Sequence, residues 1–167
     1  EQAEIDAFFE REMPNADTQP LFDAAKKLGV GFYLGYAELA EENGKTKHYN
    51  TAILVDRSGQ IVGKYRKVHL PGHSDHRPHM PYQHLEKHYF DVGDIGFGTW
   101  DFAGGKFGMA ICNDRRWPET YRVMALQGAE VVVLGYNTPT HIPWEPVYDH
   151  LSAFHNHLVM QASAYQN

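Results

Sequence analysis

Cysteine is almost absent from this sequence: the 167 residues include one, Cys112. A single thiol excludes an internal disulfide framework and is typical of a reducing compartment, so we expect a cytoplasmic protein. No apolar run reaches the ~18 residues that a transmembrane helix needs, so we expect no membrane partner. The opening residues, EQAEIDAFFERE, are acidic and lack the basic start of a signal peptide.

Positive charge is also scarce, because 15 Lys and Arg face 21 Asp and Glu and the net charge is −6. A nucleic-acid surface requires clustered Lys and Arg, and the one basic stretch is KYRK at residues 64–67. We therefore expect no nucleic-acid partner. Hydrophobic residues make up 43% and aromatic residues 13%, which is typical of a globular chain long enough for one domain.

Hydrophobic periodicity and turn residues predict four helices and several strands. The predicted helices span residues 3–14, 17–29, 118–128 and 149–164, with Asp17 or Thr18 as the cap and Gly29 as the stop of the second. A buried strand is predicted over 30–39, followed by a polar turn over 41–47. Hairpins are predicted over 49–68 and 99–111, and a long loop rich in Pro and His over 70–87.

Residues 107–136 read as a strand–turn–helix–strand unit that ends in the buried strand AEVVVLGY. Such units have parallel strands and a right-handed crossover. Because hairpins accompany this unit, the sequence predicts an α/β domain with a mixed sheet.

Cys112 stands in MAICNDRRWPE, at the carboxyl end of a predicted strand, which is where open α/β sheets bind ligands. The N-terminus of the next helix, together with Arg115 and Arg116, would favour thiolate over thiol. Backbone N–H groups of the turn could face an oxyanion. The alternative is a buried structural cysteine, since free Cys is among the most buried residue types. The local pattern leaves both interpretations open.

Lys67 ends a predicted strand in IVGKYRKVHLPG and enters the long loop. An ammonium there could pair with a thiolate and stabilise an oxyanion. The alternative is an exposed edge lysine, and residue spacing alone does not place Lys67 beside Cys112.

The stretch GKYRKVHLPG, followed by GMAICNDRRWPE, resembles the nitrilase superfamily of carbon–nitrogen hydrolases. The branch that acts on N-carbamoyl-D-amino acids is resembled by YNTAILVD, HLEKHYF, RRWPE and GYNTPTH. The resemblance implies an α-β-β-α sandwich, incomplete at both ends, so that residues 1–167 form a partial hydrolase domain. It also implies a homo-oligomer that uses no metal or other cofactor.

In this family a Glu-Lys-Cys triad performs catalysis. By resemblance, Cys112 is the nucleophile, Lys67 is the triad lysine and Glu86 is a further glutamate that positions the substrate. The triad's general base is the glutamate of a Phe-Pro-Glu-like motif, which does not occur here, and Glu38 lacks that context. We therefore expect an internal segment of a longer chain, inactive alone. The residues that match substrate-binding positions are Arg115, Arg116, Asn113, His69, His84, Asn137 and Thr138.

The implied reaction converts an N-carbamoyl-D-amino acid to the D-amino acid, ammonia and carbon dioxide through a cysteine acyl-enzyme. A substrate carboxylate suits a guanidinium, but adjacent arginines diverge, so one of the pair would bind it and the other would hold a loop carboxylate. Another amidase, a β-ureidopropionase-like enzyme and a non-catalytic sandwich protein are the alternatives. A metal site on His73, His76 and His79 ranks below them, because the loop offers no Cys and no second ligand pair.

Overall fold

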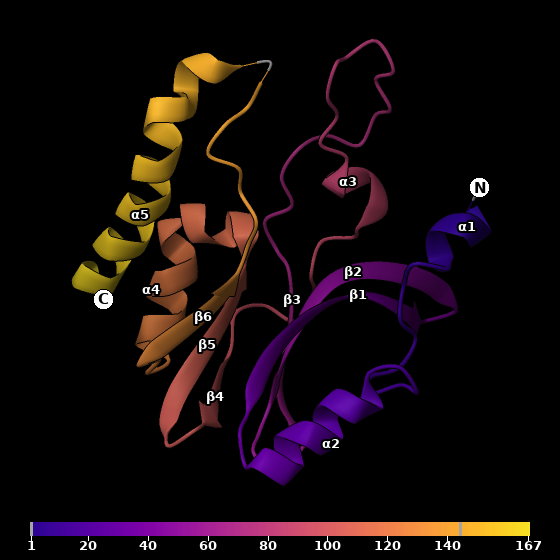
Figure 1. Ribbon diagram of the computed structural model, residues 1–167, viewed down its shortest axis with the longest axis vertical. Helices are drawn as coiled ribbons and strands as arrows, with labels where there is room; N and C mark the ends of the chain where they lie inside the picture. Colours follow the sequence, from indigo (N-terminus) through magenta and orange to yellow (C-terminus); the bar gives the residue numbers. More distant parts are fainter. Residues whose placement is uncertain (1, 144) are drawn as a thin grey trace.

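The computed structural model describes residues 2–143 and 145–167 (Figure 1). Its first sheet has the order β1-β2-β3, and all neighbours are antiparallel. The strands are β1 (Phe32–Glu42), β2 (Lys45–Val55) and β3 (Ile61–Arg66). Asn43 and Gly44 both have positive φ, at 52° and 72°, which closes β1 and β2 with a two-residue turn. The turn predicted over 41–47 is therefore too long, and the strand predicted over 30–39 continues to Glu42.

The second sheet has the order β4-β5-β6. Its strands are β4 (Thr99–Phe102), β5 (Gly105–Ile111) and β6 (Val131–Gly135). β4 and β5 are antiparallel, whereas β5 and β6 are parallel and are joined through α4 (Pro118–Leu126). The predicted strand–turn–helix–strand unit is confirmed, and with it the mixed sheet.

The two sheets pack face to face around one core. Ala52, Leu54 and Tyr65 from the first sheet contact Met109 and Ile111 from the second. Successive side chains on a strand point to opposite faces, so the neighbours of these residues point outwards. This alternation gives each sheet one face for the core and one face for a helix.

Helices cover both outer faces (Figure 1). Ile53 and Val55 pack with Phe22 of α2 (Gln19–Leu28) outside the first sheet. On the outer face of the second sheet lies α4, and α5 (Asp149–Gln166) packs beside α4. The predicted α-β-β-α sandwich is therefore confirmed.

The N-terminal prediction is partly wrong. The helix predicted over 3–14 is only α1 (Gln2–Asp6), because the backbone of Glu10 instead forms a parallel bridge with Glu38 on β1. Gly29 ends α2 with φ +67°, as predicted. Neither predicted residue caps the start of α2 through its side chain; instead Asn15 Oδ1 accepts the N–H groups of residues 17 and 18, at 3.1 and 2.9 Å.

The remaining elements are short. They are α3 (Glu86–Tyr89) and two 3-10 helices, η1 (Cys112–Arg116) and η2 (Pro146–Tyr148). Within the described residues, no helix combines the length and apolar character needed to cross a membrane.

Candidate active site

Cys112 lies where β5 ends and η1 begins, as the sequence predicts. Its φ is +45°, in the left-handed region that non-glycine residues rarely adopt. Strain of this kind persists only where the surroundings enforce it, and it concentrates at functional sites. The residue is half-buried, and it contacts the core cluster between the sheets without being enclosed by it.

Asp114 enforces the bend at Cys112. Its side chain is fully buried, and Oδ2 accepts the hydroxyl of Tyr65 at 2.8 Å and the N–H of Ile111 at 2.9 Å. The other oxygen, Oδ1, accepts the N–H of His69 at 2.9 Å and lies 3.0 Å from its Nδ1. Because Tyr65 and His69 flank Lys67, this one carboxylate joins the lysine segment to the bend.

Tyr65 remains a donor to that carboxylate because burial, followed by the charge of Asp114, raises the pKa of the phenol. Asn113 adds a further link between the two segments, as its Nδ2 donates to the carbonyl of His69 at 3.1 Å. The sequence motifs do not mark Asp114 or Tyr65 as site residues. The available signal was an acid placed two residues after a candidate nucleophile.

Lys67 is buried, with 1% of its side chain exposed, so the alternative of an exposed edge lysine is wrong. Its ammonium donates to Glu86 Oε1. The side-chain amide of Asn50 donates to the same oxygen at 3.0 Å. The structure thus brings together Lys67, which directly follows β3, and Glu86, the first residue of α3. His84 Nε2 stands 3.7 Å from the other oxygen of Glu86.

Arg115 and Arg116 have different environments. Arg115 is buried: Nη1 donates to the carbonyl of Cys112 at 2.6 Å, and Nη2 donates to Thr138 Oγ1 at 2.8 Å and to Asn156 Oδ1. Its guanidinium also lies 4.4 Å from the centre of the Tyr136 ring. The prediction that one arginine is structural agrees with this geometry. The predicted loop carboxylate is wrong, because the partners are a carbonyl, a hydroxyl and an amide.

Arg116 is exposed at a cavity of about 350 Å³ between η1, the segment after β6 and α5. Thr138 and Asn156 line the same cavity, and α5 also contributes His155. Asn156 and His155 are site residues that the sequence did not reveal, since nothing in α5 marks them as facing the bend. Asn137 is exposed on the segment after β6.

His69 is held by stacking as well as by Asp114. Its ring stacks with Phe97 and Trp117, at centroid distances of 5.8 and 5.1 Å. The half-buried imidazole therefore forms one wall beside the bend rather than extending freely into solvent.

Glu38 belongs to a different cluster. It accepts Arg66 Nε at 3.0 Å, Arg66 Nη2 at 2.9 Å and Thr51 Oγ1 at 2.7 Å, and it also pairs with Lys64. Burial opposes ionisation, but the hydrogen bonds from Arg66, Lys64 and Thr51 prevail and lower its pKa from 4.5 to about 2. A carboxylate that is held by so many ion pairs and hydrogen bonds is a poor general base, which agrees with the sequence-based exclusion of Glu38.

The histidine-rich loop does not gather its side chains. His73 Nδ1 lies 2.8 Å from the carbonyl oxygen of Asp75, while His76 and His79 are exposed. Across residues 2–143 and 145–167, no three His, Cys, Asp or Glu side chains are grouped so that they could hold a metal ion.

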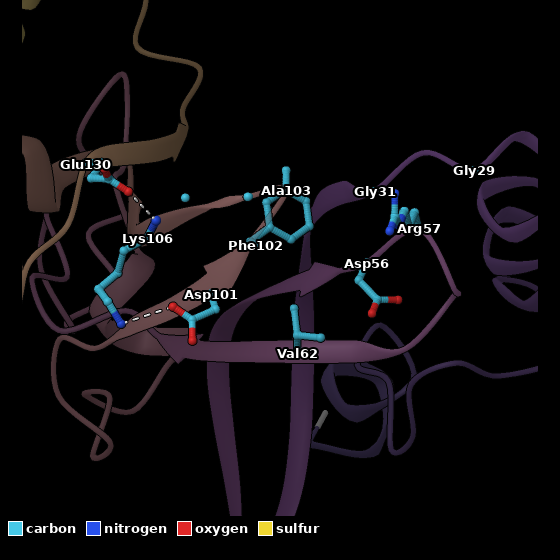
Figure 2. Close-up of a pocket in the computed structure, with 12 residues that line it drawn as sticks. Gly29, Gly31, Asp56, Arg57, Val62, Asp101, Phe102, Ala103, Lys106 and Glu130 are labelled. Atoms are coloured by element: carbon cyan, nitrogen blue, oxygen red, sulfur yellow. Dashed lines mark hydrogen bonds and ion pairs between the residues drawn. The ribbon is translucent and has the colours of Figure 1, made fainter.

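A second cavity, of about 910 Å³, is lined by residues of both sheets, among them Val62 of β3 and Phe102 of β4 (Figure 2). It opens at the β4–β5 turn, and β5 runs from there to the bend, a span of about 20 Å at 3.3 Å per residue. Its lining includes the ion pair of Lys106 Nζ with Asp101 Oδ1, at 3.1 Å, and the Glu130 carboxylate accepts the backbone N–H of Lys106 at 2.8 Å. None of the predicted site residues lines it.

Comparison with known families agrees with the sequence and the geometry. The family model for carbon-nitrogen hydrolase matches residues 1–167. The chain belongs to the carbon-nitrogen hydrolase family. The resemblance predicted from the lysine and cysteine motifs is therefore confirmed at the level of the family.

Relatives of this carbon-nitrogen hydrolase carry several names. N-carbamoylputrescine amidase of Solanum lycopersicum is 37% identical over 170 residues, covering 99% of this chain and 51% of the relative. Citrullinase of Francisella tularensis is 42% identical over 152 residues, covering 90% and 49%. A carbon-nitrogen hydrolase structure from Helicobacter pylori G27 is 28% identical with a TM-score of 0.68, covering 88% and 46%.

The chain spans about half the length of the curated relatives it matches. Both relatives are named for compounds that contain a carbamoyl group, but neither is named for an N-carbamoyl-D-amino acid. The family is thus established, while the D-amino-acid substrate stays a prediction.

Proposed function

We propose that the protein carrying this chain hydrolyses a carbon–nitrogen bond of a carbamoyl group, with Cys112 as the nucleophile. The observation that carries the proposal is the junction at Asp114, which ties a strained cysteine bend to the segment holding a buried, Glu86-paired lysine. A structural lysine gains little from burial beside a single carboxylate, because desolvation of both charges is costly. An ammonium that must meet developing negative charge gains from that arrangement.

In the proposed reaction, Cys112 Sγ attacks the ureido carbonyl carbon of the substrate. The Lys67 ammonium and the N–H of Asn113 stabilise the oxyanion, the carbon–nitrogen bond breaks, and ammonia leaves. Water then hydrolyses the thiocarbamate formed on Cys112, which restores the thiol, and the carbamate that is released decomposes to carbon dioxide and an amine. The general base is the one triad member that the resemblance does not place within these 167 residues, since Glu38 is engaged by Arg66 and Lys64.

We propose an N-carbamoyl amino acid as the substrate, with Arg116 as the partner of its carboxylate. Arg115 already donates to three oxygen atoms of the protein, whereas Arg116 is exposed at the 350 Å³ cavity beside the bend. A D-amino acid is the finer form of this proposal, carried by the resemblance of RRWPE and GYNTPTH. The second candidate is a carbamoyl amine, favoured by the similarity to N-carbamoylputrescine amidases.

The nucleophile is tested by Cys112→Ser in the protein that carries this chain. We expect loss of turnover of at least about 10³-fold, because a serine hydroxyl lacks the thiol's acidity and nucleophilicity. Iodoacetamide should inactivate the natural protein to the same degree, and EDTA should leave its rate unchanged. Full activity of the serine variant would place the nucleophile on another residue, and inactivation by EDTA would favour the metal alternative.

The substrate class is tested by Arg116→Ala. On N-carbamoyl amino acids, kcat/KM should fall about 10- to 100-fold, the equivalent of one lost charge-assisted hydrogen bond. On N-carbamoylputrescine, the rate should not fall. Arg57→Ala is the matched control, since Arg57 is an exposed arginine at the distant cavity. An unchanged kcat/KM for Arg116→Ala on N-carbamoyl amino acids would remove the argument for carboxylate recognition.

A further inference from the structure

Asn50 lies directly across the sheet from Lys67. The β2–β3 ladder pairs Thr51 with Arg66, and the N–H of Lys67 donates to the carbonyl of Asn50 at 2.8 Å, which extends the ladder by one residue. Opposed residues of antiparallel strands send their side chains to the same face. The amide of Asn50 and the ammonium of Lys67 therefore emerge side by side at the edge of the sandwich that holds the bend.

Both side chains converge on one atom. Glu86 Oε1 accepts from Asn50 Nδ2 at 3.0 Å and from Lys67 Nζ, while Oε2 is directed towards His84. Glu86 is the first residue of a helix only four residues long, which follows a long loop. Such a short helix restricts the rotation of a glutamate side chain very little, and the Asn50 amide supplies the missing restriction.

We propose that Asn50 is a positioning residue, which fixes the rotation of the Glu86 carboxylate and thereby aims the Lys67 ammonium. This inference rests on the proposed function of Lys67 and deepens it. Asn50 touches no reacting atom in this scheme and acts through Glu86. A misaimed ammonium costs rate in the chemical step, because a displacement of about 1 Å can reduce catalysis by about 10²-fold.

Two substitutions separate orientation from packing. Asn50→Ala removes the donor, and kcat should fall about 10- to 100-fold while KM changes by less than about threefold. Asn50→Asp keeps the shape but places a second carboxylate against Glu86, so at neutral pH its kcat should fall below that of Asn50→Ala. Thr46→Ala, which loses one exposed side-chain hydrogen bond on the same strand, is the control and should keep the natural kcat.

The dependence of kcat on pH distinguishes a positioning role of Asn50 from a packing role, because a loss of packing would not shift it. Protonation of the new aspartate restores an O–H donor to Glu86, and the neighbouring carboxylate favours that protonation. The kcat profile of Asn50→Asp should therefore shift to lower pH, whereas Asn50→Ala should keep the natural profile at reduced height. A natural kcat in both variants, or an Asn50→Asp profile that does not shift, would overturn the inference.

Failure of the proposed function gives a different result. The proposed function would be wrong if the natural protein turned over no carbamoyl compound. It would also be wrong if the Cys112→Ser variant turned over carbamoyl compounds as fast as the natural protein. The positioning of Glu86 would then be read from crystal structures of the variants. A Glu86 carboxylate turned away from Lys67 in Asn50→Ala supports the inference, and an unchanged Lys67–Glu86 contact contradicts it.

Discussion

At the scale of the residue, Asp114 and Arg115, which follow the thiol, contact the backbone of the bend more closely than they contact the sulfur. Arg115 Nη1 lies 2.6 Å from the carbonyl of Cys112 but 3.9 Å from its sulfur. Asp114 is fully buried and accepts hydrogen bonds from Ile111, just before the bend, and from Tyr65 of the segment that holds Lys67. The sequence pattern suggests a cluster that acts on the thiol and on the substrate. The structure shows that two of its members hold the backbone of Cys112 in its unusual conformation.

Asp114→Asn tests that role. The amide would turn an N–H group towards donors that now face a carboxylate oxygen, leaving at least one buried donor unpaired. We expect the free energy of unfolding to fall by about 3 kcal/mol, measured by chemical denaturation. Asp101→Asn is the control, because its side chain is 90% exposed and it should change stability by less than about 0.5 kcal/mol. Equal stability of the two variants would contradict the role of Asp114 as the link between the segments.

At the scale of the element, glycines mark where the layers approach most closely. A Cβ on Gly63 of β3 would lie 2.7 Å from Cδ2 of Trp100 on β4, so the indole packs directly on the backbone of the opposite sheet. A Cβ on Gly108 of β5 would lie 2.5 Å from the sulfur of Met124 on α4. These two positions set how closely β3 approaches β4 and how closely α4 approaches β5.

Gly63→Ala should therefore lower the free energy of unfolding by about 1–3 kcal/mol, as overpacking of a core does. The matched control is Gly35→Ala on β1, where the added Cβ would find its nearest atom at 3.9 Å. That variant should be neutral or slightly more stable, since it loses less chain entropy on folding. Thermal and urea unfolding of the pair provide the measurement, and a Gly63→Ala protein as stable as Gly35→Ala would show that the Trp100 ring can move without cost.

At the scale of the whole molecule, a second set of charges lies apart from the Lys67–Glu86 pair. Arg66 Nη1 donates to Glu42 at 2.7 Å and to Asp94 at 2.9 Å, in addition to the bonds from this guanidinium to Glu38. Burial opposes its charge, but the bonds to Glu38, Asp94 and Glu42 prevail and raise the pKa of Arg66. The network joins β1 and β3 to the segment that follows α3.

This network predicts how acid unfolds the protein. The pKa of Glu38 is about 2 in the folded protein against an ordinary value of 4.5, so its contribution is fully present above pH 4.5. The contribution is lost as the pH falls from 4.5 towards 2, because the unfolded chain takes up the proton first. We expect a loss of about 2 kcal/mol across this window after allowance for screening at the partly exposed Lys64.

Glu38→Gln provides the comparison for that measurement. Denaturation followed from pH 5 to pH 2 should show a shallower dependence on pH in the variant, together with lower stability at pH 5. A natural protein and a variant that lose stability in parallel would show that Glu38 makes no special contribution to acid sensitivity.

Much of the fold follows from local patterns. Asn43-Gly44 predicts a tight turn, Gly29 ends a helix, and Pro118 begins one, because these residues restrict their own backbone or tolerate positive φ wherever they occur. The predicted helix over 3–14 fails for the opposite reason. Its local pattern is helical, but pairing of Glu10 with the edge of β1 satisfies the backbone in another way.

The candidate site also has features that follow from local sequence and features that depend on the tertiary structure. Residue types and their order along the chain are enough to place a thiol at the end of a strand and to suggest the family. They do not show which arginine turns inward, that Asp114 accepts a hydrogen bond from Tyr65 across 49 residues, or that Asn50 and Lys67 share one oxygen of Glu86. Those contacts depend on how two sheets stack and on where a loop crosses them. Packing of distant segments sets that arrangement, and no short stretch of sequence encodes it.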